Sequence, residues 1–226
     1  MDTLHKVFAE EATEQNKVAR QNALLICQNL SFPAATRATL FQFGDGKLFE
    51  TMFKVMCNTK NEHNKTASEK ALATIANMSN KKENNLPMAQ NTKFIAKLIE
   101  YCKTEGEIKR HGINILAKIA SGAMLTAPFL LKAPGDVLTT MMGIVREAGP
   151  ELSKWKKGNS NEFWALTFLM NLAQAEYSVK PMTKGGVVDL LKGAVSQTSK
   201  ECLQAAITVA FLSGYDKTGE IFSTLR

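Results

Sequence analysis

Side chains that could carry acid–base, nucleophilic or metal chemistry are few in this 226-residue sequence, and they lie far apart. The three histidines, His5, His63 and His111, fall in separate segments. No glycine-rich phosphate loop and no HExxH, GxSxG or paired CxxC pattern occurs. Residues 44–47, Gly-Asp-Gly-Lys, faintly resemble a phosphate-binding turn but lack its other glycines and a preceding strand, which favours an ordinary interhelical turn. The sequence therefore predicts a non-enzyme with no catalytic, cofactor-binding or metal residues.

The four cysteines, Cys27, Cys57, Cys102 and Cys202, are widely spaced, and each falls in an apolar helical pattern. This arrangement matches no zinc or redox motif and predicts buried, reduced thiols. The N-terminal stretch is acidic and polar, unlike a secretory signal. No apolar run approaches the roughly 18 residues that cross a bilayer. We therefore expect an intracellular protein, cytoplasmic or nuclear, with no membrane span.

Basic residues outnumber acidic ones, 28 to 21, which gives a formal charge of +7. This excess permits contact with nucleic acid but does not indicate sequence-specific binding, because the lysines are scattered. The densest group surrounds Trp155, at Lys154, Lys156 and Lys157. Turn-forming residues flank this group at 149–150 and 158–160, so we predict a loop or short helix outside the folded core.

Apolar periodicity of the helical kind runs through the sequence, and strand signals are nearly absent. One order recurs: a medium helix, a break, a short helix, a tight turn and another medium helix. Aligning the copies on their opening helix places five residues in one column, at intervals of roughly 40 to 50 residues. This column consists of Asn29, Asn77, Lys118, Asn171 and Phe211. A structural unit has therefore been repeated along the chain.

The segment FLMNLAQAEYSVKPMTKGGVVDLLKGAV, at residues 168–195, and its weaker copies resemble armadillo repeats. The resemblance implies an all-α fold, a right-handed α-solenoid of about four full armadillo-like units and a partial fifth. The sequence departs from the pattern at Lys118 and Phe211, which replace the column asparagine, and the fourth unit alone keeps Gly-Gly. We expect a single domain over residues 1–226, with units at about 15–60, 61–104, 105–147, 160–197 and 198–226 and an insertion at 148–159.

Two narrower resemblances rest on residues that also serve the generic repeat. NLSFPAATRATLF is similar to the armadillo segments of rotatin-type centriole and basal-body scaffolds. ATIANMS and LMNLAQAEYSVKPMTKGGVVDLL are similar to the C-terminal armadillo domain of Osa-type SWI/SNF chromatin-remodelling subunits. No AT-rich DNA-binding domain accompanies the second. These resemblances imply a centriole or cilium scaffold, or a nucleic-acid-associated subunit, as alternative functions.

In armadillo proteins the third helix of each unit lines a concave groove, and the aligned column lies at the end of those helices. Counting back four and seven residues stays on one helical face. The predicted strip is Asn22, Leu25, Asn29; Lys70, Ala73, Asn77; His111, Asn114, Lys118; Trp164, Thr167, Asn171; Gln204, Ile207, Phe211. Within it, the candidate partner-binding residues are Asn29, Asn77, Asn114, Lys118, Trp164 and Asn171.

The column asparagines have two interpretations. Their amides can hydrogen-bond the backbone of an extended peptide, or they can simply finish helices. Trp164 is similarly either a binding anchor or a wall of the core or groove. Importin-type proteins carry a tryptophan four residues before the asparagine, and this sequence has none there. We therefore expect a non-catalytic scaffold, or a structural subunit of a larger assembly, that binds a protein partner or peptide segment other than a basic import signal.

Overall fold

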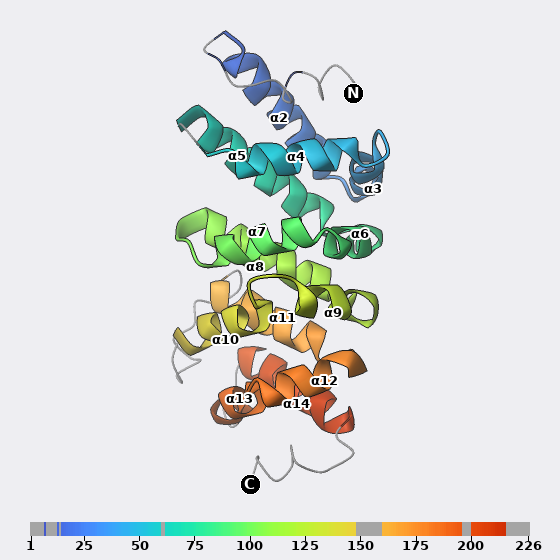
Figure 1. Cartoon of the computed structure of the whole chain (residues 1–226), viewed down its shortest axis with the longest axis vertical. Coiled ribbons are helices and arrows are strands. Elements are labelled where there is room, and N and C mark those ends of the chain that lie inside the picture. Colours follow the sequence, from blue (N-terminus) through green and yellow to red (C-terminus); the bar gives the residue numbers. More distant parts are fainter. Residues whose placement is uncertain are drawn as a thin grey trace. The chain divides into compact units, whose positions relative to one another are not determined.

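The computed structural model describes residues 7, 13, 15–59, 62–147, 160–195 and 200–215. Every regular element in these ranges is a helix, which confirms the predicted all-α class (Figure 1). The chain divides into two compact units, residues 1–84 and 85–226. The predicted insertion at 148–159, including Trp155 and its lysines, lies outside the described residues. The predicted boundaries of the repeats stay predictions.

The first unit contains α2 (Lys17–Ser31), α3 (Ala34–Gln42), α4 (Lys47–Cys57), α5 (Glu62–Met78) and a 3-10 turn at Lys82–Asn84. Helix α5 packs against both α2 and α4, and the short α3 contacts all three. Leu24, Met52, Met56 and Ile75 are fully buried between these helices. The apolar periodicity seen in the sequence therefore corresponds to the faces that form this core.

The second unit contains α6 (Asn85–Gln90), α7 (Thr92–Cys102), α8 (Gly106–Ala120), α9 (Ala123–Lys132), α10 (Val137–Glu147), α11 (Asn161–Leu172), α12 (Glu176–Lys184), α13 (Val187–Val195) and α14 (Lys200–Tyr215). Three helices follow one another three times, and we call the first, second and third of each set the short, the medium and the long helix, because the third is always the longest. The long helices pack in series, α8 against α11 and α11 against α14, and each also packs against the medium helix that precedes it (Figure 1). Equivalent positions on α8, α11 and α14 therefore lie on neighbouring helices.

The turn at residues 44–47 has the ordinary interhelical role that the sequence predicts. Gly44, Asp45 and Gly46 have φ values of 62°, 58° and 85°, which reverse the chain between α3 and α4. A left-handed backbone conformation costs glycine little free energy, because glycine has no Cβ atom, and aspartate adopts it more readily than most residues. Gly135 and Asp136, with φ values of 103° and 52°, play the same part before α10.

The prediction of buried cysteines is wrong at one position. Cys57 is exposed, whereas Cys27 and Cys102 are buried as expected. Cys57 is the last residue of α4 and falls beside the apolar face formed by Val55 and Met56 rather than on it. Helix α7 is capped by Asn91, whose Oδ1 atom accepts the backbone N–H of Phe94 at 3.0 Å.

A repeated proline is a feature of the fold that the sequence interpretation did not use. Pro87, Pro128 and Pro181 each lie in a short helix, α6, α9 and α12 respectively. Each follows its column residue, Asn77, Lys118 or Asn171, at the same spacing. Both Pro128 and Pro181 lie inside their helices, where proline supplies no N–H to the carbonyl four residues earlier.

A candidate binding strip on the long helices

The predicted positions of the second unit form one surface on three neighbouring helices. We call the following nine residues the strip: His111, Asn114, Lys118, Trp164, Thr167, Asn171, Gln204, Ile207 and Phe211. Each is half-buried or exposed, whereas Leu116 and Leu169, on other faces of α8 and α11, are fully buried. The side chain of Gln204 donates to the Thr167 hydroxyl oxygen at 2.9 Å, so α11 and α14 turn these positions toward each other. The helical count from the sequence therefore selected surface positions.

Two of the column asparagines connect their helix to the preceding long helix. The Asn171 Nδ2 group donates to the backbone carbonyl of Ala117 on α8 at 3.0 Å. In the first unit, the Asn77 Nδ2 group donates to the Ser31 hydroxyl oxygen at the end of α2, at 2.9 Å. This interhelical role was in neither interpretation of the sequence. A primary amide has two N–H groups, so each bond leaves one N–H for a ligand.

The remaining candidate residues lie at the surface of their helices. Asn29 is exposed on α2 in the first unit. Asn114 is half-buried on α8, and its amide makes no hydrogen bond within the part of the chain that the structure describes. Lys118 is also half-buried, and its backbone carbonyl accepts from the Asn85 amide at 2.9 Å. Whether these side chains bind a partner stays a prediction.

Trp164 stands in the first turn of α11, where the Ser160 hydroxyl oxygen accepts the backbone N–H of Phe163 at 3.1 Å and caps the helix. The indole meets the Phe163 ring edge-on, with centroids 5.3 Å apart and planes at 82°. Such a contact holds both rings in place. Because Trp164 is half-buried, part of its surface is open to a ligand. The position suits either an anchor or a groove wall.

The ionisable side chains of the strip are both of basic types. Lys118 and His111 belong to it, and none of its nine residues is aspartate or glutamate. The His111 Nε2 atom lies 4.0 Å from the Glu107 carboxylate, one turn earlier on α8 and outside the strip. The strip is therefore a polar and aromatic surface that is neutral to weakly positive.

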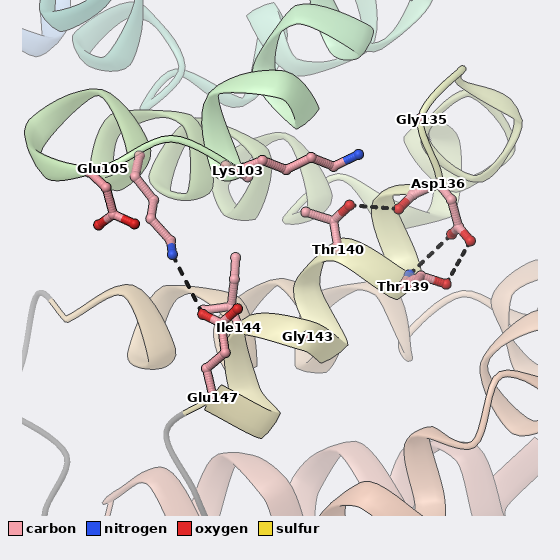
Figure 2. Close-up of a pocket in the computed structure, with 11 residues that line it drawn as sticks. Lys103, Glu105, Gly135, Asp136, Thr139, Thr140, Gly143, Ile144 and Glu147 are labelled. Carbon is pink, nitrogen blue, oxygen red and sulfur yellow. Dashed lines mark hydrogen bonds and ion pairs between the residues drawn. The ribbon is translucent and has the colours of Figure 1, made fainter.

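A separate pocket of about 650 Å³ lies between α7, α8 and α10 (Figure 2). The Lys109 ammonium group lies 3.6 Å from the Glu147 carboxylate, and the Asp136 carboxylate accepts from the backbone and hydroxyl of Thr139 at 3.0 and 2.6 Å. These hydrogen bonds from Thr139 lower the pKa of Asp136. At the pocket wall, burial raises the pKa of the Cys102 thiol to about 12, which disfavours the nucleophilic thiolate. Asp136, Lys109 and Glu147 are thus bound to neighbours within the fold.

Several solved structures with a similar fold are designed or engineered proteins. Computationally designed armadillo repeat proteins for modular peptide recognition superpose with a TM-score of 0.76 at 13% identity, covering 99% of this chain and 85% of theirs. A designed armadillo repeat protein in complex with the peptide (KR)4 gives a TM-score of 0.74 at 14% identity and the same coverage. The chain has the armadillo-repeat fold. An engineered protein of 18% identity, with a TM-score of 0.70, covers 94% of this armadillo-repeat chain and 80% of its own.

No protein-family model matches the armadillo-repeat chain, and no curated protein matches it either. The narrower resemblances to rotatin-type scaffolds and to Osa-type chromatin-remodelling subunits therefore gain no support. In the described ranges, no helix has the length and apolar character that would let it cross a membrane. The described residues also hold no group of three or more histidine, cysteine, aspartate or glutamate side chains placed to bind a metal ion.

Proposed function

We propose that this armadillo-repeat protein is a non-catalytic scaffold that binds an extended peptide segment of a partner protein through the strip on α8, α11 and α14. The observation that carries the proposal is the repetition of surface-facing polar and aromatic residues at equivalent positions of three helices packed in series. A peptide is itself a repeating polymer, so a repeating surface can meet it in register. Designed armadillo repeat proteins made for modular peptide recognition have the same fold.

The strip offers the groups that an extended backbone requires. A peptide in this conformation presents N–H and C=O groups that are not used within the peptide. The Asn114 amide can donate to and accept from them, and Asn171 keeps one N–H. Trp164 adds a large flat surface for an apolar peptide side chain. The amides would hold the backbone, and Trp164 would contribute most of the apolar contact.

The strip favours a neutral or acidic peptide over a basic one. Its cationic residue, Lys118, would repel lysine and arginine side chains, and the strip holds no carboxylate to attract them. The positions where importin-type proteins stack basic peptides on tryptophan hold Leu25, Ala73, Asn114, Thr167 and Ile207. The peptide (KR)4 is bound by a designed relative in fold, and we expect this chain to reject that peptide.

Removing an anchor and an amide together tests the strip. Ligands would first be selected for the whole chain from a displayed library of random peptides. The double substitution Trp164→Ala and Asn171→Ala should make the free energy of binding of the selected peptides less favourable by at least about 2 kcal/mol, the scale of a binding hot spot. Lys93→Ala, an exposed position on α7, is the matched control and should leave the affinity unchanged. Calorimetric binding measurements, with circular dichroism to show that the helices persist, decide the outcome.

Two results would contradict this proposal. Unchanged affinity in the double variant would show that the selected peptides bind somewhere other than the strip. Selection of mainly lysine- and arginine-rich peptides would contradict the charge argument. If the double variant unfolds, Trp164→Phe and Asn114→Ala test the same surface with smaller structural changes, because Asn114 makes no side-chain hydrogen bond within the described part of the chain.

A further inference from the structure

Three exposed apolar side chains stand on the short helices of the second unit. Met124 and Leu125 are 73% and 63% exposed at the start of α9, and Tyr177 is 47% exposed at the start of α12. Helices α9 and α12 pack against each other. Met124 and Tyr177 follow the column residues Lys118 and Asn171 at the same spacing, so they are equivalent positions of adjacent repeats. We call Met124, Leu125 and Tyr177 the apolar ridge.

The repeated proline changes the backbone at this ridge. Pro128 and Pro181 lie four residues after Met124 and Tyr177 within continuous helices. A helical carbonyl normally accepts the N–H of the residue four positions later, and proline has no N–H. The carbonyls of Met124 and Tyr177 therefore both lack their usual helical donor. Two hydrogen-bond acceptors are thus repeated in register, each at an exposed apolar residue.

The charges of α9 and α12 favour an acidic occupant. Lys132, Lys180 and Lys184 are exposed on these helices, and Glu176 is their one acidic residue. Facing copies of this surface would bring the lysines of both copies together, which disfavours self-association through it. A segment with carboxylates between its apolar side chains would complement the lysines.

The ridge lies next to one end of the strip. The Tyr215 hydroxyl at the end of α14 donates to the backbone carbonyl of Gln174, which lies in the connection between α11 and α12. Phe211, the last strip residue, is 38% exposed one turn before Tyr215. The two surfaces are neighbours but share no residue, because the ridge lies on the short helices and the strip on the long ones, so each can be altered by its own substitutions.

We propose that the apolar ridge binds an extended segment of a partner protein in which apolar and acidic side chains alternate. Successive side chains of an extended chain point to opposite sides, so one set can pack on Met124, Leu125 and Tyr177 while the other approaches the lysines. The backbone N–H groups of the segment donate to the carbonyls of Met124 and Tyr177. This surface and its ligand do not depend on the strip, which is the basis of the proposed function.

The probe is a labelled decapeptide that alternates leucine and glutamate, measured by fluorescence anisotropy against the whole chain. Pro128→Ala with Pro181→Ala restores the missing helical donors without touching the exposed side chains. A carbonyl that accepts from its own helix again no longer accepts from the probe. The affinity for the probe should therefore fall by about fivefold for each carbonyl, which is the typical contribution of one hydrogen bond. Met124→Ser with Leu125→Ser and Tyr177→Ser should weaken it at least as much. Because the strip also suits acidic peptides, the probe is measured in parallel against Trp164→Ala with Asn171→Ala, which removes that second surface, and the ridge substitutions should weaken probe binding by the same factors in this background.

Comparison peptides test which features of the ligand the ridge recognises. A decapeptide that alternates leucine and lysine, and one that alternates serine and glutamate, should both bind more weakly than the leucine–glutamate probe. Equal affinity of the wild type and the double proline variant would overturn the proposal, and so would preferred binding of the wild type to vesicles rich in phosphatidylserine. If Trp164→Ala with Asn171→Ala abolishes probe binding and the ridge variants do not, the ligand belongs to the strip, and the ridge assignment fails while the proposed function stands.

Discussion

The column asparagines combine two tasks that are usually considered separately. Asn77 and Asn171 each donate to the preceding long helix, and each keeps a second N–H. The Asn171 oxygen also accepts from Gln174 at 3.4 Å. A side chain that bridges two helices cannot swing freely, so the remaining N–H is held in one direction. The same bond that joins adjacent repeats therefore positions the amide for a ligand, at a reduced entropic cost of binding.

Replacing Asn171 by Ala should lower the free energy of unfolding by about 1 kcal/mol, because the bond to the Ala117 carbonyl is lost. Asn171→Asp should lower the free energy of unfolding further, since a carboxylate oxygen, which cannot donate, would replace the N–H donor that faces the Ala117 carbonyl. Asn114→Ala on α8 is the matched control and should change stability by less than about 0.5 kcal/mol. Urea denaturation followed by circular dichroism measures all three. Equal stability of Asn171→Ala and the wild type would show that the interhelical bond contributes nothing.

At the scale of elements, the medium helix α10 begins at an aspartate that caps it. The Asp136 carboxylate accepts from the backbone N–H and the hydroxyl of Thr139, and the negative charge lies at the positive end of the helix. Because these hydrogen bonds lower the pKa of Asp136 in the folded state, its ionised form stabilises the fold. That contribution is complete above the ordinary aspartate pKa of about 3.9 and is lost as the pH falls through the lowered value.

Asp136→Ala should therefore lower the free energy of unfolding by about 1 kcal/mol at neutral pH, a typical cost for losing an N-terminal cap. The difference from the wild type should shrink as the pH falls through the lowered pKa of Asp136. Urea denaturation at several pH values measures it. Glu69→Ala, an exposed position inside α5, provides the control for losing one carboxylate. A difference that is the same at every pH would show that the charge of Asp136 is unimportant.

Helix order and surface positions could be predicted from the sequence, because local periodicity determines both. The faces formed by Ile75 and Leu172 are apolar in the sequence and buried in the structure. The bond between Asn77 and Ser31 could not be predicted, since it joins residues that are distant in sequence and depends on how α2 meets α5. The repeated prolines were visible at equal spacing after the column. Their consequence for the Met124 and Tyr177 carbonyls required knowing that α9 and α12 continue through them.

At the scale of the whole molecule, stability is local. Each long helix packs mainly on its neighbours, and the two compact units have cores of their own. In repeat architectures the total stability is approximately a sum of contributions from each repeat and from each interface between neighbours. A substitution that leaves a cavity in the core should therefore lower local stability most in the unit that contains it. Met52 in the first unit and Leu169 in the second are both fully buried and provide matched sites for such defects.

Met52→Ala and Leu169→Ala should each remove about 2–5 kcal/mol of local stability, as for large-to-small substitutions in other cores. Amide hydrogen exchange with mass spectrometry should show faster exchange in α2, α4 and α5 for the first variant, and in α8, α11 and α14 for the second. Exchange in the other unit should change much less, because opening can occur in part of a repeat array without the rest. Equal acceleration of both units by either variant would instead indicate one cooperative core. Peptides from α7, which contacts neither substituted helix extensively, provide the internal reference within the second unit.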